Sequence, residues 1–381
     1  MTTLRKLASI QRVLNVKPIE GADYIECLTV LGWQCVAKKG EFQKDDLVVF
    51  IEPDSILPER PEFEFMRPRN FKVRTVKLRK QISQGIVFPL SILPDDRGYS
   101  EDANVTEILG ITKYEPELPQ NLRGSSRSPY RYKYPQLPNW FYNAMRKVLP
   151  LSIFKKFLCV TSGAGFPSFI PKTDETRVQV LQGLLDKYQG TQCYITEKLD
   201  GSSITCYLKD GQFGVCSRNV DLKEEVGNTF WDTVRELGIE QKMRENIPKW
   251  RNFAIQGELI GEGIQQNKLK LTGHTIRFFN VFDIDIQKYA DLNDFKEYIE
   301  QLKLPIVPVL NENFILTGDI DELVKLSIGK SVICPTAQRE GIVIRPLFEQ
   351  EETEEARGYL VRNRLSFKAI NPEFLLKYQE A

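Results

Sequence analysis

The chain of 381 residues contains a single histidine, His274, and its seven scattered cysteines include no Cys-x-x-Cys pair. A structural zinc site is therefore not expected, because such sites need clustered cysteine and histidine ligands. An odd number of cysteines without a signal peptide predicts reduced thiols and an intracellular protein. No apolar run approaches the roughly 20 residues of a membrane-spanning helix, so we expect a soluble protein that does not bind membranes.

The sequence also lacks an excess of either charge, with 52 basic and 51 acidic residues. Net charge gives no sign of a nucleic-acid partner, and any surface for one must come from local clustering. Hydrophobic residues make up 41% of the chain, which is enough to bury the core of about two domains. No internal repeat is present.

The most informative segment reads Glu-Lys-Leu-Asp-Gly-Ser-Ser from Glu197 to Ser203 and follows strand-like residues directly. A lysine such as Lys198 becomes a nucleophile when its amine loses its proton, which a desolvated, cation-rich pocket favours. The Asp200-Gly201 turn lets backbone approach a phosphate, because glycine tolerates positive φ and close contact. The segment suits attack on a nucleotide α-phosphate. On its own, it fits an exposed lysine at a surface turn as well.

Further polar segments follow in order along the chain. They are Ser217-Arg218-Asn219, the strand around Glu258, the aromatic strand with Phe279 and Asp283, Glu340-Gly341, and Ser366-Phe367-Lys368. The series resembles the covalent nucleotidyltransferase superfamily, which includes ATP-dependent polynucleotide ligases and mRNA capping enzymes. The resemblance covers roughly the last 220 residues and keeps the motif order.

The resemblance implies that Lys198 attacks the ATP α-phosphorus, expels pyrophosphate and holds AMP through a phosphoramide bond. Arg218 and Lys368 would neutralise the charge that develops on the phosphate. Lys368 would also keep Lys198 deprotonated through like-charge repulsion. Either cation could instead be a solvated strand residue. Asp200 is expected to join this catalytic set.

The resemblance also assigns the remaining nucleotide and metal contacts. Glu197, Gly201 and Glu258 are expected to bind the nucleotide, with the Glu258 carboxylate accepting from a ribose hydroxyl. Glu340, Asp283 and Asp200 are expected to organise Mg²⁺ or Mn²⁺, which prefer oxygen ligands. Phe279 is expected to stack on adenine. The alternatives are an edge-strand charge for Glu258 and a core position for Phe279.

We expect three regions: an OB-like nucleic-acid-binding domain at 1–108, an inter-domain connection at 109–165, and an adenylyltransferase domain at 166–381. Short alternating strands between residues 10 and 93 predict a small barrel, which resembles an OB module. The middle region is rich in proline, tyrosine and basic residues, which interrupt regular elements. The fold class is α+β: the barrel followed by antiparallel sheets that line an ATP cleft, with helices outside.

A predicted strand in the first region alternates basic and apolar residues. Its basic face could follow a nucleic-acid backbone, or it could be a solvated face. The basic residues are Arg67, Arg69, Lys72, Arg74, Lys77 and Arg79. The next residues, 81–85, predict a turn.

Other local patterns belong to the last region. An Asp210-Gly211 hairpin and helices near 230–237 and 291–302 are expected there. Five glutamates between 349 and 355 predict an exposed loop.

The order of the domains selects a branch of the superfamily. The OB-like segment comes first and only 13 residues follow Lys368, which resembles the Deinococcus-type RNA ligases. This group also tolerates Ser366 where many relatives carry a second lysine. We therefore predict a monomeric, ATP-dependent RNA ligase that seals nicks in RNA or RNA/DNA duplexes as RNA repair. The alternatives are a DNA ligase or mRNA guanylyltransferase, and an inactive protein that binds RNA ends.

Overall fold

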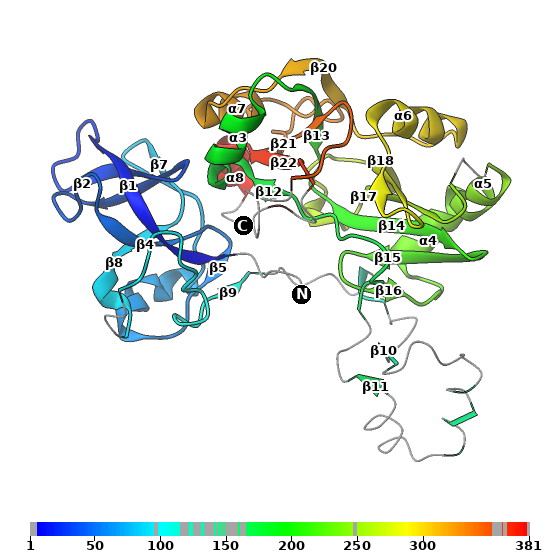
Figure 1. Cartoon of the computed structure of the whole chain (residues 1–381), viewed down its shortest axis with the longest axis horizontal. Helices are drawn as coiled ribbons and strands as arrows, with labels where there is room; N and C mark the ends of the chain where they lie inside the picture. The colour runs from blue at the N-terminus through cyan, green and yellow to red at the C-terminus, as the bar shows by residue number, and fades with distance from the viewer. Residues whose placement is uncertain are drawn as a thin grey trace. The chain divides into compact units, whose positions relative to one another are not determined.

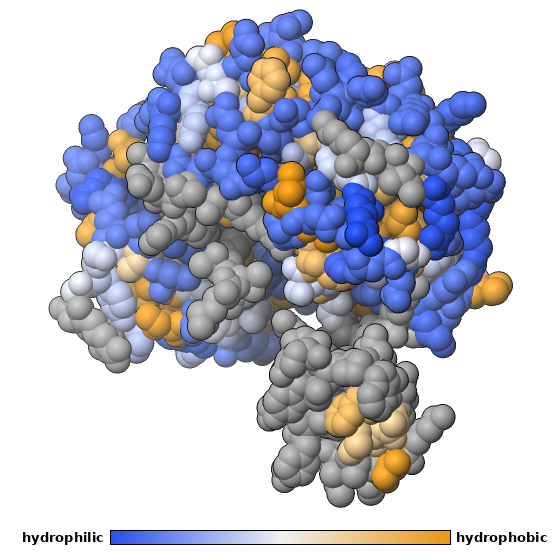
Figure 2. Space-filling model, turned by 45° about the vertical axis from the view of Figure 1, so that its right-hand side comes forward, coloured by the Kyte–Doolittle hydropathy of each residue, from blue (hydrophilic) through white to orange (hydrophobic). Residues whose placement is uncertain are grey.

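A computed structural model of the chain describes residues 6–94, 98–114, 122–124, 165–246, 250–352, 360 and 364–378, with isolated positions between 131 and 160. Most of the predicted connection at 109–165 lies outside this part. Among the described residues, no helix has both the length and the apolar character that crossing a membrane requires. On the face drawn in Figure 2, hydrophilic residues dominate and hydrophobic ones form small, separate groups.

The amino-terminal region folds as a five-stranded sheet in the order β3-β2-β1-β4-β8 (Figure 1). The strands are β1 (Ala8–Pro18), β2 (Ile25–Val30), β3 (Trp33–Lys38), β4 (Leu47–Ile51) and β8 (Ile86–Pro89). One half of β1 pairs with β4 and the other half with β2, with a bulge after Val13. A bulge bends a strand, so β1 can serve both halves of a curved sheet. Trp33 and Phe50 fill the core on its inner side.

The predicted basic strand is wrong. Residues 61–69 form the 3₁₀ helix η1 (Pro61–Arg69), and only β6 (Val76–Leu78) and β7 (Gln81–Ser83) are extended. Asn70 and Phe71 have positive φ, which breaks the period-two alternation. The turn also lies earlier than predicted, because Arg79 and Lys80 take the positive φ angles of a tight hairpin. The alternation of basic and apolar residues did not indicate the 3₁₀ helix or the bend that follows it.

Short elements complete the amino-terminal region. They are β5 (Ser55–Ile56), which pairs with β9 (Thr112–Lys113), and the 3₁₀ helix η2 (Leu90–Ile92). Phe63, Met66 and Val73 pack with them into a second core.

A second five-stranded sheet has the order β12-β22-β21-β13-β20. Its strands are β12 (Thr176–Arg177), β13 (Gln192–Lys198), β20 (Val309–Ile315), β21 (Gly341–Pro346) and β22 (Phe367–Ile370). Helices η4 (Val178–Val180), α3 (Gln182–Tyr188), α7 (Ile320–Ser327) and α8 (Pro372–Tyr378) accompany it. Ile195, Ile342 and Phe367 bury one face against Leu185 and Leu323.

The third sheet has the order β16-β15-β14-β17-β18-β19. Its strands are β14 (Ser202–Lys209), β15 (Gln212–Ser217), β16 (Asp221–Leu222), β17 (Phe253–Gly261), β18 (His274–Asp283) and β19 (Lys288–Tyr289). The 3₁₀ helix η5 (Gln265–Asn267) lies between β17 and β18 in the chain. Helix α5 (Ile239–Glu245) precedes β17, and α6 (Leu292–Gln301) follows β19. The predicted hairpin is confirmed, since Asp210 and Gly211 connect the paired residues Lys209 and Gln212.

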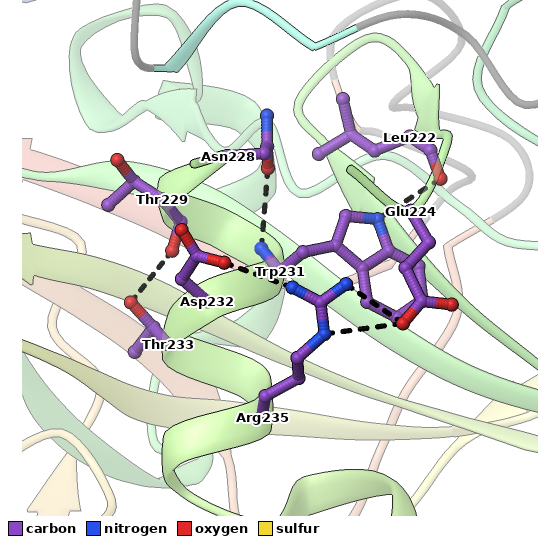
Figure 3. A network of polar contacts seen from close by, with 8 residues as sticks. All are labelled: Leu222, Glu224, Asn228, Thr229, Trp231, Asp232, Thr233 and Arg235. Atoms are coloured by element: carbon purple, nitrogen blue, oxygen red, sulfur yellow. Dashed lines mark hydrogen bonds and ion pairs between the residues drawn. The ribbon is translucent and has the colours of Figure 1, made fainter. Parts of the chain in front are cut away.

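Helix α4 (Thr229–Glu236) shows how local chemistry fixes an element on this sheet (Figure 3). Asn228 caps the helix by accepting from the Trp231 backbone N–H. The Trp231 indole is buried against Phe213 and donates to the Leu222 carbonyl. On the outer side, Arg235 pairs with carboxylates of Glu224 and Asp232. The two helices predicted near 230–237 and 291–302 are thus confirmed.

The acidic segment differs from the exposed loop that its composition predicts. Glu352 is buried, accepts from the Tyr188 hydroxyl at 2.7 Å and pairs with Lys187 at 2.7 Å. Glu349 pairs with Arg364. Glu354 and Glu355 lie outside the described residues. A charge run does not show which of its members find partners elsewhere in the chain.

The chain divides into two compact units that cut across the predicted ranges. Unit 1 comprises Met1–Glu117, Glu175–Lys198 and Pro308–Ala381, and unit 2 comprises Leu118–Asp174 and Leu199–Val307. Within unit 1, the barrel is attached to the second sheet by the Asp54–Arg177 ion pair and by the Gly32 N–H, which donates to the Gln179 carbonyl at 2.8 Å. Arg177 is itself the ladder partner of Lys368.

Candidate active site

Lys198 and Glu340 form the central contact of the site in unit 1. Lys198 ends β13 directly opposite Gly341, the first residue of β21, so Glu340 arrives beside it. The Lys198 Nζ lies 2.6 Å from each Glu340 carboxylate oxygen. The side chains are 25% and 16% exposed, respectively. The nucleophile candidate is thus partly desolvated and held as an ammonium by a carboxylate that an incoming cation could reach.

Lys368 shares the face of the sheet that carries Lys198. Gly341 pairs with both Lys198 and Ile370, and Lys368 lies two residues before Ile370 on β22. Residues two apart in a strand point to the same face. Two strand spacings and two residues separate the Cα atoms of the two lysines by roughly 12 Å, which their long side chains can span. This polar face therefore presents two cations and a carboxylate.

A set of hydrogen-bonded polar side chains around the buried Arg345 lies next to these residues. It was not predicted from the sequence. Arg345 is opposite Tyr194 in the ladder, and it donates to the Ser366 hydroxyl at 2.9 Å and to the Glu175 carboxylate at 2.9 Å. Burial raises the pKa of the Tyr194 phenol, so it stays neutral beside the guanidinium. Ser366 is thus bonded directly to a buried cation.

Glu197 does not lie on the polar face, contrary to its predicted contact with the nucleotide. It is buried on the opposite side of β13, and its Oε2 accepts from the Val332 backbone N–H at 2.8 Å. Adjacent strand residues point to opposite faces. The side chain of Glu197 therefore bonds to the protein backbone on the face of β13 opposite to Lys198.

In unit 2, Asp200 pairs with Lys268, a residue that the sequence did not single out. The Asp200 Oδ2 lies 2.6 Å from the Lys268 Nζ, and both side chains are mostly buried. Lys268 follows three successive residues with positive φ, Gln265 to Asn267, in the connection from β17 to β18. Asn267 clamps that connection by bonding both backbone groups of Leu271.

Gly201 is needed for a different reason from the one expected. It is not among the residues with positive φ. A Cβ at this position would instead lie 2.5 Å from the Leu259 carbonyl oxygen and 2.8 Å from the Glu258 Cγ. Any side chain here would displace Glu258. Gly201 thus leaves the space that Glu258 occupies.

Glu258 and Arg218 both belong to unit 2. Glu258 is half-buried on β17, opposite Ser203 on β14 and Arg277 on β18. Arg218 follows β15, is largely exposed and pairs with Asp174. This ion pair uses only one of the guanidinium nitrogens.

Phe279 is the half-buried aromatic of β18, whereas Phe278 and Phe282 are fully buried. The ladder explains this difference, because Phe279 is the extra residue of a bulge between the pairs Gly257–Phe278 and Gln256–Asn280. Bulges re-aim a side chain and often lie next to active sites. The bulge is compatible with a stacking role and could not be read from the sequence pattern.

Asp283 is not placed as a metal ligand. One of its oxygens accepts from the backbone N–H groups of Asp285 and Ile286, which closes a turn. It pairs with Phe253, at the far end of β17 from Glu258. Five residues of strand separate these positions by roughly 16 Å. The carboxylate is a turn residue, and we withdraw it from the metal set.

The residues predicted to bind nucleic acid lie in two places: on and just after η1, where some already have partners, and in the β6–β7 hairpin. Arg67 is paired with Glu64 and Glu59, and Lys72 lies 4.1 Å from the centre of the Tyr114 ring. Arg69 is exposed on η1 and Arg74 is half-buried. In the β6–β7 hairpin, Lys77, Arg79 and Lys80 are all exposed.

The carboxylates that remain fit a hydrated divalent cation. Within the described ranges, no three histidine, cysteine or acidic side chains are grouped closely enough to hold a metal alone. Mg²⁺ and Mn²⁺ need no such group, because carboxylate, water and phosphate oxygens suit them. Glu340 and Asp200 offer hard oxygen donors, each now facing a lysine. A cation would therefore compete with an ammonium at either position.

A barrel of the OB type and a lysine–carboxylate pair on a polar sheet face define a nucleotidyltransferase of the polynucleotide-ligase class. The family comparisons agree. An RNA ligase family model matches residues 191–370, and an OB-fold domain model matches residues 7–90.

Solved structures are similar over the whole chain. A mutant of the Naegleria gruberi RNA ligase without ligand is 32% identical with a TM-score of 0.80, and the match covers 100% of both chains. Another mutant, solved with ATP and Mn, has the same identity and TM-score over 99% of this chain and 100% of its own, as does the ligase solved with PPi. A search of curated proteins finds no match. The chain belongs to the RNA ligase family, and the predicted α+β class with an amino-terminal OB fold is confirmed.

Proposed function

We propose that this ligase uses ATP to join RNA 3′-hydroxyl and 5′-phosphate ends through an adenylate carried on Lys198. The observation that carries the proposal is the Lys198 Nζ at 2.6 Å from both oxygens of Glu340. The similar Naegleria gruberi enzyme, solved with ATP and Mn, supports ATP as substrate and a divalent cation as cofactor. The reaction has three steps, and each makes a different demand on the chain.

In the first step, the Lys198 amine attacks the α-phosphorus, a P–N bond forms and pyrophosphate leaves. An amine held by a carboxylate keeps its proton, so Glu340 controls when Lys198 becomes nucleophilic. A divalent cation bound through Glu340 would neutralise the triphosphate and draw carboxylate charge away from the ammonium. Lys368, on the same face as Lys198, stabilises charge on the α-phosphate.

The remaining predicted contacts place the nucleotide. We propose that Glu258 accepts from a ribose hydroxyl and that Phe279 stacks on adenine. We also propose that the free N–H donors of the Arg218 guanidinium, which pairs with Asp174 through one nitrogen, bind phosphate. Gly201 leaves room for Glu258, and Phe279 is turned by its bulge.

In the second and third steps, AMP moves to the RNA 5′-phosphate, and the RNA 3′-hydroxyl then displaces it. A substrate with a nick in a duplex holds both ends adjacent, which lowers the entropic cost of joining them. We propose nicked RNA or RNA/DNA duplexes as substrates and RNA repair as the role. The amino-terminal OB fold supports a nucleic-acid contact outside the nucleotide site.

The experiment incubates the enzyme with α-labelled ATP and Mg²⁺ or Mn²⁺. We expect a covalent label on Lys198 that survives denaturation and alkali with ATP and none with GTP, which separates a ligase from a guanylyltransferase. Nicked duplexes with each RNA/DNA combination then test the substrate. Sealing should require ribose on the hydroxyl side, since a protein recognises RNA through its 2′-hydroxyl. An unlabelled enzyme, or equal sealing of all-DNA nicks, would contradict the proposal.

The exposed cations of the β6–β7 hairpin should bind the RNA backbone. Replacing Lys77, Arg79 and Lys80 by glutamine is expected to weaken RNA binding and to make the slope of log K against log salt shallower by about two to three. Adenylation of Lys198 should be unchanged, because the first step involves no RNA. The matched control replaces the exposed lysines 38, 39 and 44 of the same barrel, which changes net charge equally. Equal salt slopes in the two triple variants would remove the hairpin from the RNA interface.

A further inference from the structure

Glu197 is next to Lys198 in the chain but is buried on the other face of β13. One oxygen, Oε2, accepts from the Val332 N–H at 2.8 Å. The other, Oε1, has no hydrogen-bond partner within the described part of the chain. A buried carboxylate with one bonded oxygen is an unusual way to hold a backbone N–H.

This carboxylate is a poor source of stability. Moving a carboxylate from water into the protein interior costs free energy unless its oxygens accept hydrogen bonds. Only one of the two Glu197 oxygens does so. Glutamine could accept the same bond without the charge. The bond between Glu197 and Val332 therefore suggests a role other than stability.

The segment that Glu197 holds leads directly to Glu340. We call it the 329–339 loop, which follows α7 and precedes β21. The Ser331 N–H donates to the Ala337 carbonyl at 3.1 Å, and the Arg339 N–H donates to Gly329 at 3.0 Å. The Ser331 hydroxyl also accepts from the N–H groups of the two residues that follow Val332. These bonds make the loop one braced piece, so fixing Val332 fixes the residues before Glu340.

The other end of the loop is fixed from the strand that carries Lys368. The fully buried Asn371 donates from its Nδ2 to the Arg339 carbonyl at 3.0 Å, and its N–H donates to the Glu340 carbonyl at 2.9 Å. Glu340 is thus approached through a loop attached at one end to the strand of Lys198 and at the other to the strand of Lys368. Such attachments set where its carboxylate lies relative to the lysine amine.

We infer that Glu197 is a positioning residue: through Val332 and the 329–339 loop it holds the Glu340 carboxylate against Lys198. This inference rests on the proposed function, because Glu340 matters only if Lys198 is adenylated. Glu197 touches neither substrate nor the reacting atoms. Groups that orient a metal-binding carboxylate typically change metal affinity or activity 10- to 100-fold when they are removed.

The test compares Glu197→Leu with Glu197→Gln in single-turnover labelling by α-labelled ATP over a range of Mn²⁺ concentrations. We expect Glu197→Leu to slow labelling about 10- to 100-fold and to raise the half-saturating Mn²⁺ concentration. Glu197→Gln should restore both to within about threefold, because it keeps the acceptor for Val332. The unfolding temperature of Glu197→Gln should be no lower than that of wild type, because this variant keeps the acceptor for Val332 and removes a half-paired buried charge.

A second pair of variants tests the same bond from its donor. Val332→Pro deletes the N–H and should reproduce the Mn²⁺ shift of Glu197→Leu, whereas Val332→Ala keeps the N–H and should match wild type. In the background of Glu340→Gln, Glu197→Leu should add no further loss, because a residue that acts through Glu340 is coupled to it.

Three results would overturn the inference. The first is a wild-type Mn²⁺ dependence in Glu197→Leu or Val332→Pro. The second is a loss of rate in Glu197→Leu that follows a loss of thermal stability with no change in Mn²⁺ dependence. The third is an additive loss in the double variant with Glu340→Gln. A wild-type enzyme that takes no label would instead refute the proposed function, so the two failures are distinguishable.

Discussion

Lys198→Arg is expected to abolish labelling by α-labelled ATP, with a loss on the order of 10⁴-fold or more, as for other enzymes that lose a nucleophile. Arginine keeps the positive charge and can still pair with Glu340, but its guanidinium does not give up a proton near neutral pH. The fold and the ion pair should therefore survive while the chemistry fails. Single-turnover labelling, quenched with EDTA and detergent, measures the effect.

The reaction sequence provides a sharper check on the same variant. RNA that already carries AMP on its 5′-phosphate needs only the third step, which does not involve the Lys198 amine. Lys198→Arg should therefore seal a pre-adenylylated nick at a rate near that of wild type. The control is Lys209→Arg, at a half-buried lysine paired with Asp210 at the end of β14, which should label normally. A labelled Lys198→Arg enzyme would show that another residue carries AMP.

Glu340→Gln is expected to lower the rate of labelling by about 10²- to 10³-fold, because charge stabilisation through a bound cation is worth several kcal/mol. Glutamine preserves the size of the side chain and one acceptor, but it neither balances the Lys198 ammonium nor binds a cation as a carboxylate does. The half-saturating Mn²⁺ concentration should rise as well. A titration of the labelling rate against Mn²⁺ measures both effects.

The control for this variant is Glu351→Gln, which removes the same charge from an exposed position. It should leave the rate and the Mn²⁺ dependence unchanged. The unfolding temperature of Glu340→Gln should stay close to that of wild type, because both partners of the ion pair keep some contact with solvent. If Glu340→Gln labels at the wild-type rate with the wild-type Mn²⁺ dependence, Glu340 is a counter-charge for Lys198 and has no role in binding the cation.

Elements with strong local signals could be predicted from the sequence. The Asp210-Gly211 hairpin formed where turn chemistry required it, and α4 and α6 matched the period of their apolar residues. The basic segment failed because positive φ at Asn70 and Phe71 interrupts what looks like simple alternation. Local patterns are reliable where backbone conformation follows from residue type, and unreliable where a core draws the chain into a bend.

The candidate site was predictable only in part. The string around Lys198 and the order of the later motifs identified the class of chemistry, and the structure brings Lys198, Glu340 and Lys368 to one sheet. The partners of these residues could not be predicted, since Arg345, Lys268 and the Val332 N–H carry no local signal. Asp283 shows the opposite error, because a carboxylate in a motif-like strand proved to close a turn.

By itself, the sequence determined the kind of reaction this protein can perform, because a lysine nucleophile, phosphate-binding cations and metal carboxylates must be present as residue types in any fold. The tertiary structure alone decided which of them act together. Lys198 and Glu340 are 142 residues apart, and their contact depends on the antiparallel register of β13 and β21. The same register places Glu197 on the face opposite to Lys198, because a shift of one residue would reverse the side to which every side chain of the strand points.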